Sequence, residues 1–347
     1  MSVKKSLILM LFAASAFFVG CGSTNNDDRK TYEAVTRDVF AMDTYMNMKA
    51  YGKEAETALE EAENRIHKLE EELSATSETS DIWKINHSNG NEVALCDDTA
   101  VLIEKAIEVG SCTNGALDIT VFPILKEWGF TTGEYHIPEK AKLDTLLSNV
   151  DYRKIEIDGN SVSIPYNSEI DLGALAKGYT GDEIMKIFKS HGIGSAIVSL
   201  GGNVQAIGSK PDGSAWKVAV RDPFSPDTDM CVVEIKDKAV ITSGNYERFF
   251  TDDNGQKYWH IIDPADGYPA DNGFVSVTVI GDNGLNCDCL STALFVAGED
   301  GYENIIKEYA DYDFIFVTDD EKILYTKGIA DNFQNISSMT AEVIAVD

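Results

Sequence analysis

The chain has 347 residues and carries 29 Lys and Arg against 58 Asp and Glu, which gives a formal net charge of −29. Hydrophobic residues make up 44% of the chain and aromatic residues 10%, a composition typical of a globular protein with a large core. Nucleic-acid-binding proteins displace counterions with Lys and Arg, so we expect no nucleic-acid partner and expect any phosphate ligand to be held locally, by a metal, a glycine-rich backbone or a placed Lys.

The N-terminal residues have the pattern of a bacterial export signal. Lys4 and Lys5 precede an apolar run over Leu7–Val19, which is too short to span a bilayer comfortably and has the positive flank of a signal peptide. The run ends in Phe-Val-Gly before Cys21, which resembles a lipobox, whose Cys is lipidated after cleavage. A simple secretory signal with an incidental Cys is the alternative. The predicted segments are a signal peptide at 1–20, a lipid-anchored polar tether at 21–34 and one domain at 35–347.

Hydrophobic periodicity predicts strands in runs, with helices inserted between the runs. Alternating apolar residues predict a strand over 38–49, and a helical stripe follows from Ala55 to Leu73. A second helix is predicted from Asp97 or Asp98, either a favourable N-cap, to about Gly110. The other predicted elements are a hairpin at 154–164, a helix from about 182, helices at 288–297 and 302–309, and strands at 196–208, 216–221, 232–241, 258–262, 274–280, 314–317 and 323–325. This order favours an α+β fold with mainly antiparallel sheets.

Two glycine-containing segments are candidates for ligand contact. Segment 171–182 contains Gly173, Gly178 and Gly181, each of which lowers helix propensity by about 1 kcal/mol relative to Ala. A purely helical role is therefore not expected; the glycines allow a ligand to approach the backbone, and Lys177 between them suits a phosphate. An ordinary glycine-containing turn is the alternative. For the paired glycines in Ser199–Asn203, a simple turn is favoured.

Two further segments carry groups suited to catalysis and metal binding. His260 directly precedes a turn rich in Asp, Gly and Pro, a position suited to a general base, although a structural His is the alternative. Asp288 and Thr292 are four residues apart and share one helix face. With phosphates and water, these two hard oxygen ligands would suit Mg²⁺, whereas a helix N-cap and a packed surface residue are the alternative roles.

Together these segments resemble the bacterial ApbE-like FAD:protein FMN transferases, from about Phe40 to Phe333. Ala41–Thr44 resembles the family's MGT strand, and Thr242–Arg248 resembles a glycine-containing turn to which no role is assigned. The longer matches are Gly115–Gly129 to GAxDxTVxPLxxxWGF, Asp171–Asp182 to DLGxIAKGYxxD, His260–Pro269 to HIIDPxTGxP, and Asp288–Gly298 to DALSTALxxxG. The resemblance implies the ApbE-like flavin transferase fold.

The resemblance also implies roles for individual residues. Mg²⁺ would be bound by the side chains of Asp288 and Thr292 and by the backbone carbonyl of Ala174, and His260 would be the base. The positions that match FAD contacts are Met42, Ala116, Leu117, Asp118, Lys177 and Asp182. Thr76 stands where many members have a Tyr that stacks on the flavin, and Asp43 replaces the usual Gly. The missing ring bears on whether FMN is transferred or FAD is only hydrolysed.

The activity implied is Mg²⁺-dependent transfer of FMN from FAD to a Thr or Ser hydroxyl of an extracytoplasmic acceptor flavoprotein, with release of AMP. The expected location is the extracytoplasmic face of the bacterial cell membrane, through the lipid anchor. Two alternatives stay open: a Mg²⁺-dependent FAD pyrophosphatase, and a non-catalytic FAD-binding lipoprotein. Incubation with FAD, Mg²⁺ and an acceptor distinguishes them, because the products are protein-bound flavin, free FMN with AMP, or unchanged FAD.

Overall fold

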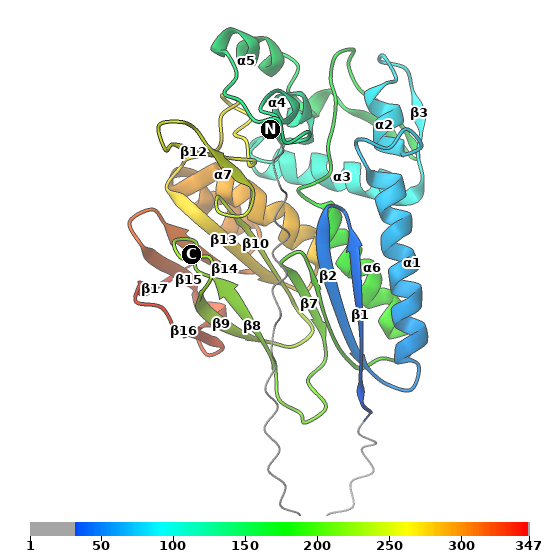
Figure 1. Cartoon of the computed structure of the whole chain (residues 1–347), viewed down its shortest axis with the longest axis vertical. Helices are drawn as coiled ribbons and strands as arrows, with labels where there is room; N and C mark the ends of the chain where they lie inside the picture. The colour runs from blue at the N-terminus through cyan, green and yellow to red at the C-terminus, as the bar shows by residue number, and fades with distance from the viewer. Residues whose placement is uncertain (1–31, 346–347) are drawn as a thin grey trace, which may run out of the picture. The chain divides into compact units, whose positions relative to one another are not determined.

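The computed structural model describes residues 32–345, so the predicted signal peptide, Cys21 and most of the tether lie outside the described residues. A nine-stranded sheet runs through the described part of the chain (Figure 1). In spatial order its strands are β1 (Ala34–Ala41), β2 (Thr44–Tyr51), β6 (Ser195–Leu200), β7 (Asn203–Ile207), β10 (Ala239–Gly244), β13 (Phe274–Gly281), β14 (Asp313–Thr318), β15 (Lys322–Thr326) and β17 (Thr340–Ile344). Only β15 and β17 pair in parallel, which confirms the predicted α+β class with mainly antiparallel sheets.

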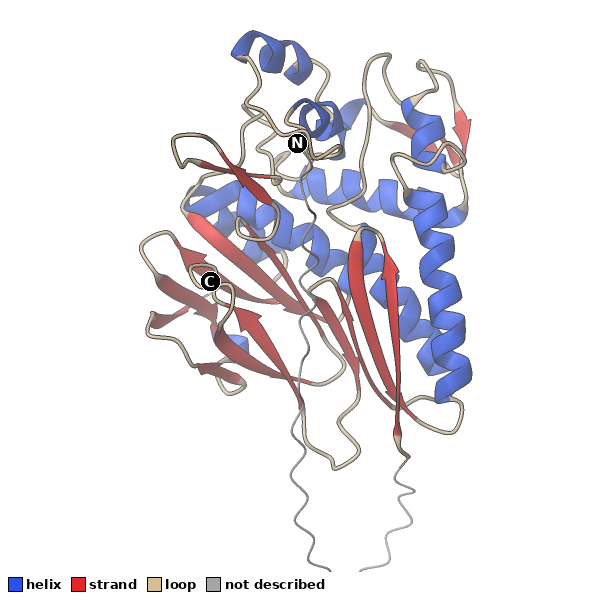
Figure 2. Cartoon of the chain, in the orientation of Figure 1, coloured by secondary structure: helices blue, strands red, loops and turns tan. Residues whose placement is uncertain are grey.

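Helices cover one face of this sheet and a small sheet covers the other (Figure 2). The covering helices are α1 (Ala55–Leu73), α3 (Asp97–Cys112), α6 (Ala176–Ser190) and α7 (Gly284–Glu308). The small sheet contains β8 (Trp216–Arg221), β9 (Asp229–Ile235) and β16 (Phe333–Asn335). Alternation along β10 sends Ile241 into the helical core and Val240 toward the small sheet.

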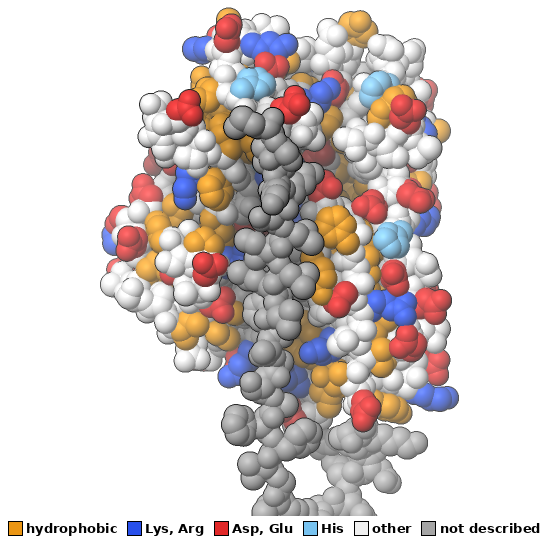
Figure 3. Space-filling view, in the orientation of Figure 1, with side chains coloured by type: hydrophobic (Ala, Val, Ile, Leu, Met, Phe, Trp, Pro, Cys, Tyr) orange, Lys and Arg blue, Asp and Glu red, His pale blue; other side chains and the backbone are white. Residues whose placement is uncertain are grey.

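Short elements make up the rest of the described chain. They are α2 (Asp81–Asn86), α4 (Phe122–Glu127), α5 (Lys140–Leu147), the 3₁₀ turns η1 (Ile119–Val121), η2 (Tyr152–Lys154) and η3 (Lys327–Ile329), and the strands β3 (Val93–Ala94), β4 (Glu156–Asp158), β5 (Ser161–Ser163), β11 (Phe249–Thr251) and β12 (Lys257–Trp259). The predicted hairpin at 154–164 is β4–β5. No helix in residues 32–345 is long and apolar enough to cross a membrane. Acidic side chains are spread over the visible face rather than gathered in one patch (Figure 3).

Three predicted strands are wrong because tight turns divide them. The strand predicted at 38–49 is the β1–β2 hairpin, turned at Met42 and Asp43 with φ of 50° and 58°. Positive φ at both central residues matches the twist of a hairpin, but here no glycine signals the turn. The strand at 196–208 is the β6–β7 hairpin, turned at Gly201 and Gly202, which confirms the simple turn favoured for this segment. The strand at 232–241 is divided between β9 and β10, with Asp237 at φ 52°.

The helices predicted at 288–297 and 302–309 are two arms of α7, joined at Gly298 with φ 62°. A Cβ atom there would lie 2.2 Å from the carbonyl oxygen of Asn272, so only glycine fits the bend. The helix begins at Gly284 and is capped by Asn283, whose side chain accepts a hydrogen bond from the backbone N–H of Asn286 at 2.8 Å. The alternative role of Asp288 as the N-cap is therefore wrong.

Gly178 and Gly181 lie inside α6, so the alternative of an ordinary glycine-containing turn is wrong at these two positions. A Cβ atom on Gly178 would lie 2.2 Å from the Gly284 carbonyl oxygen and 2.6 Å from the Asp288 Cβ. A Cβ atom on Gly181 would lie 2.3 Å from Nε2 of Gln205. The two glycines let α6 approach α7 and β7 closely, and this gain in packing offsets the loss of helix propensity.

Candidate active site

The candidate site lies where the first turns of α6 cross the first arm of α7. Asp288 is only 4% exposed, and its Oδ2 accepts a hydrogen bond from the Gly178 N–H at 2.7 Å. Burial raises the pKa of Asp288, while Lys177, the Gly178 N–H and the amide of Asn203 lower it. The pair of helices thus holds a buried carboxylate that has no Lys or Arg in direct ion-pair contact among the described residues.

Thr292 lies one turn after Asp288 on the same arm, as predicted. Thr292 is partly exposed, and its hydroxyl lies 3.2 Å from Oγ of Ser243 on β10, which is also 2.8 Å from Oγ of Ser291. The end of β10 therefore fixes the Thr292 hydroxyl from the sheet side.

The carbonyl of Ala174 is available for a ligand. Ala174 lies in the turn before α6, and within the described residues no N–H donates to its oxygen. The N–H of Gly178, in the first turn of α6, has no partner inside the helix and donates to Asp288 instead. A carboxylate, a hydroxyl and an unused carbonyl on adjoining turns are the hard oxygen donors that Mg²⁺ requires. The residues present therefore fit the metal, and their assignment as its ligands stays a prediction.

His260 directly follows β12 and is held by one backbone carbonyl. Its backbone N–H donates to the Arg248 carbonyl at 3.1 Å, and its Nδ1 lies 3.2 Å from the same oxygen. Because a carbonyl can only accept, Nδ1 must carry the proton and Nε2 is left as an acceptor. The ring of Phe130 meets the imidazole edge-on at a centroid distance of 6.3 Å.

The surroundings of His260 keep its imidazole neutral. Desolvation by the surrounding protein, then the charges of Arg248 and Lys177, lower the pKa of His260 to about 4. A neutral imidazole with a free Nε2 at neutral pH is the form that a general base needs.

The charge of Lys177 acts on both the helix crossing and His260. It lies one residue before Gly178 in α6 and is partly exposed. Its charge lowers the pKa of Asp171, Asp288 and His260. The structure therefore brings Lys177, Asp288, Thr292, Ala174 and His260 into one region, and their assigned roles stay predictions.

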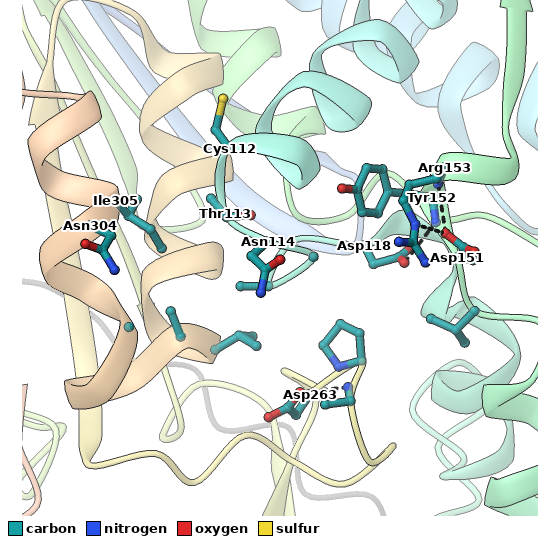
Figure 4. Close-up of a pocket in the computed structure, with 18 residues that line it drawn as sticks. Cys112, Thr113, Asn114, Asp118, Asp151, Tyr152, Arg153, Asp263, Asn304 and Ile305 are labelled. Carbon is teal, nitrogen blue, oxygen red and sulfur yellow. Dashed lines mark hydrogen bonds and ion pairs between the residues drawn. The ribbon is translucent and has the colours of Figure 1, made fainter.

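Ala116 and Asp118 line a neighbouring cavity of about 530 Å³, seen in Figure 4. Its walls come from the end of α3, residues 150–153, the turn after His260 and the second arm of α7. The Asp118 carboxylate accepts hydrogen bonds from Thr120 N–H at 2.8 Å and Tyr152 N–H at 3.0 Å, and burial raises its pKa. Leu117 points away into the core. The volume is in the range of small-molecule sites, roughly 300–1,000 Å³.

The other predicted FAD contacts are placed less directly. The Met42 N–H donates to the Glu70 carboxylate at 2.6 Å, and the Thr180 hydroxyl lies 3.8 Å from the Met42 sulfur, so Met42 lies against α6. The Asp182 carboxylate caps α7 by accepting from the N–H groups of its first two residues, Gly284 and Leu285, at 2.7 and 2.9 Å. Thr76 is exposed in the loop after α1 and contacts Ser74. Their contact with FAD stays a prediction.

Sequence reasoning missed three polar residues at the site: Asn203, Ser243 and Arg248. Asn203 is 4% exposed, its amide lowers the pKa of Asp288, and its amide nitrogen has no hydrogen-bond partner among the described residues. Each of the three lies in a segment that the sequence had marked, Ser199–Asn203 or Thr242–Arg248. The glycines in those segments were the available signal, because they mark turns at strand ends, where sites form.

Comparison with known proteins identifies the family. The ApbE family model matches residues 42–316. The chain is 30% identical over 333 residues to the FAD:protein FMN transferase of Treponema pallidum, covering 90% of this chain and 92% of that protein. The corresponding Vibrio cholerae transferase is 31% identical over 253 residues, covering 71% of this chain and 75% of that protein.

Solved structures agree with the sequence comparison. The ApbE protein from Thermotoga maritima superposes with a TM-score of 0.79 at 31% identity, covering 84% of this chain and 96% of that chain. The flavin transferase ApbE from Vibrio cholerae superposes with a TM-score of 0.76 at 26% identity, covering 88% and 97%. The predicted ApbE-like fold is confirmed, and the chain belongs to the ApbE family.

Proposed function

We propose that this protein transfers FMN from FAD to a Thr or Ser hydroxyl of an acceptor flavoprotein. The observation that carries the proposal is the α6–α7 crossing, where a buried carboxylate and an unused carbonyl lie in the same region as Lys177 and a neutral His260. The relatives named FAD:protein FMN transferase support the same reaction.

The transfer is a phosphoryl-type displacement. The acceptor hydroxyl oxygen forms a bond to the FMN phosphorus, the bond from that phosphorus to the bridging oxygen breaks, and AMP leaves with the bridging oxygen. The hydroxyl proton passes to Nε2 of His260, which its bond to the Arg248 carbonyl leaves unprotonated. Positioning and charge neutralisation supply most of the rate in such reactions.

Mg²⁺ is the proposed metal, with Asp288, Thr292 and the Ala174 carbonyl as its protein ligands. When bound there, it would neutralise the charge of the FAD diphosphate, which an acidic protein would otherwise repel. Lys177 supplies a fixed positive charge to the same region. The cavity beside Ala116 and Asp118 is the proposed place for a further part of FAD.

The direct test uses an acceptor domain that normally carries FMN on a Thr through a phosphoester bond. The domain is prepared without its flavin. The protein is incubated with FAD, Mg²⁺ and this domain, and with the same domain after its Thr is replaced by Ala. Fluorescent flavin fixed on the first domain only, with one AMP released per flavin, is the expected result. Unchanged FAD in both samples would leave a non-catalytic FAD-binding protein as the correct reading.

An FAD pyrophosphatase is the second candidate function, and Thr76 favours it. This residue stands in an exposed loop without the aromatic ring expected at its position, so water has one barrier fewer near the flavin. In the same experiment, free FMN and AMP formed equally with both acceptor domains would identify hydrolysis.

The proposed location is the extracytoplasmic face of the bacterial cell membrane, with Cys21 as the lipidated residue. The signal pattern before Cys21 and the polar tether after it support this proposal. Replacing Cys21 by Ser should release the protein from the membrane fraction into the soluble extracytoplasmic fraction. A variant that still sediments with membranes would contradict the lipid anchor.

A further inference from the structure

The segment after β10 supplies a second positive charge near His260. Arg248 is exposed, and its Nη2 donates a hydrogen bond to the Phe130 carbonyl. In the described part of the chain, Arg37, Arg65 and Arg153 form ion pairs with carboxylates, whereas Arg248 forms none. In a chain with net charge −29, an arginine without a carboxylate partner is available to an anionic ligand.

The position of Arg248 is fixed from two directions. Its backbone carbonyl accepts both hydrogen bonds from His260. Its guanidinium donates to the backbone carbonyl of Phe130, and the ring of Phe130 contacts the His260 imidazole edge-on. Its charge also acts on Asp171, in the loop that leads into α6. The guanidinium therefore lies near both the base and the α6 loop that contains Ala174. The phosphorus must lie in this region if His260 is to accept the attacking proton.

We propose that Arg248 is a further catalytic residue, which binds the transferred phosphoryl group through its free N–H groups while its backbone carbonyl keeps His260 in the tautomer of a base. This inference rests on the proposed function. A guanidinium matches the oxygens of a phosphate in a two-bond geometry, and phosphoryl transfer spreads negative charge over those oxygens. The P–O bonds form and break as described above, the proton goes to His260, and Arg248 stays protonated throughout.

The inference has a signature in the pH dependence. The charged groups that face His260 are Arg248, from the segment after β10, and Lys177, from α6; the Phe130 ring is uncharged. Both cations favour the neutral imidazole. Removing one of them should raise the pKa of His260. The acidic limb of the pH–rate profile, where protonation of His260 lowers the rate, should then lie at a higher pH than in the wild-type protein.

The test compares Arg248→Gln and Arg248→Lys with wild type and with Arg221→Gln. Arg221 is a matched control, because it is exposed and forms no ion pair among residues 32–345, but its charge acts on Tyr246 and Glu247 rather than on His260. Single-turnover AMP release from FAD is measured from pH 4 to 9, with the flavin-free acceptor domain present, and FAD affinity is titrated in parallel.

We expect Arg248→Gln to slow AMP release by about 10²- to 10³-fold, the loss typical of removing one preorganised donor, and to move the acidic limb to higher pH. Arg248→Lys should keep the limb in place and recover only part of the rate, and Arg221→Gln should leave the limb unmoved. If Arg248→Gln does not fold, the Lys variant decides the test through its rate.

Two results would overturn the inference while leaving the proposed function intact. One is a rate of AMP release in Arg248→Gln equal to that of wild type, or the same result in Arg248→Lys if Arg248→Gln does not fold. The other is a slow Arg248→Gln with an unmoved acidic limb, which would make Arg248 only a support for the Phe130 segment. Absence of AMP release from the wild-type protein would instead overturn the proposed function, and this inference with it.

Discussion

The two sides of the proposed active site are built differently. The proposed metal side, consisting of Ala174, Gly178, Asp288 and Thr292, lies in the crossing of α6 and α7, where Asp288 is only 4% exposed and accepts a hydrogen bond from an N–H in the first turn of α6. The base side, His260 with Arg248 and Phe130, lies in segments next to the strands β11 and β12, and its imidazole is held through one backbone carbonyl.

This difference predicts how each side responds to substitution. On the metal side the Asp288 carboxylate also joins α6 to α7 through the Gly178 N–H, so substitutions that break this contact should change stability and activity together. On the base side the orienting group belongs to the backbone, which a side-chain substitution leaves in place. Substitution of His260 should change the rate while leaving the fold and FAD affinity nearly unchanged.

Asp288→Asn should have the largest effect on activity. Metal charge stabilisation is worth several kcal/mol, so losing the anionic ligand should reduce turnover by about 10³-fold or more. Without Mg²⁺ the variant should be at least as stable as wild type, because a buried carboxylate is costly to keep ionised.

Thermal unfolding with and without Mg²⁺ checks this assignment independently of activity. Mg²⁺ should raise the Tm of the wild-type protein, since a ligand that binds only the folded state stabilises it, and it should leave the Tm of Asp288→Asn unchanged. An equal Mg²⁺ shift in both proteins, or near-full activity of the variant at sub-millimolar Mg²⁺, would sink the metal assignment.

His260→Ala should lower transfer by about 10²-fold or more, in line with typical general-base contributions. FAD and Mg²⁺ affinities should change much less, because the imidazole does not hold either ligand in this mechanism. Equilibrium FAD titration beside single-turnover transfer separates the two effects. Loss of FAD affinity in proportion to the rate would make His260 a binding residue and contradict the separation of the two sides.

Gly178→Ala tests the helix crossing itself. The added methyl would lie 2.2 Å from the Gly284 carbonyl oxygen and 2.6 Å from the Asp288 Cβ, so α6 must move away from α7. We expect a loss of about 1–3 kcal/mol in the free energy of unfolding, together with weaker Mg²⁺ binding. Gly194→Ala is the matched control, since nothing lies within 4 Å of its added Cβ. Equal urea midpoints for both variants would refute the crossing as the source of the effect.

The same two regions show what the sequence could predict. Asp288 and Thr292 were placed on one helix face correctly, because helical spacing alone fixes their relation. Helix propensity argues against a purely helical role for Gly178 and Gly181, because it counts their cost and takes no account of Asp288 and Gln205 opposite them. Likewise, the Met42-Asp43 turn contains no glycine, and the contact between His260 and the Arg248 carbonyl joins residues 12 positions apart through a hairpin. The local sequence pattern predicts the relation between Asp288 and Thr292. The glycine packing, the turn and the His260 contact depend on tertiary structure, which a local pattern does not contain.

Thr76→Tyr should have the smallest effect and probes a region outside both sides. Thr76 is exposed, and its loop is held by the Ser74 hydroxyl, which accepts from the N–H groups of Thr76 and Ser77 at 3.2 and 3.1 Å. A Tyr can therefore replace Thr76 without disturbing these backbone bonds. If its ring stacks on the flavin, it should add about 1 kcal/mol, or about fivefold in FAD affinity. By excluding water it should also shift products from free FMN toward protein-bound FMN.

Thr79→Tyr, exposed in the same loop, is the matched control and should change neither quantity. Fluorescence titration of FAD and chromatography of the products measure both. An FAD affinity and product ratio equal to wild type in Thr76→Tyr would show that Thr76 does not lie at the isoalloxazine ring. The balance between transfer and hydrolysis would then be set on the base side, where His260 accepts a proton either from the acceptor hydroxyl or from water.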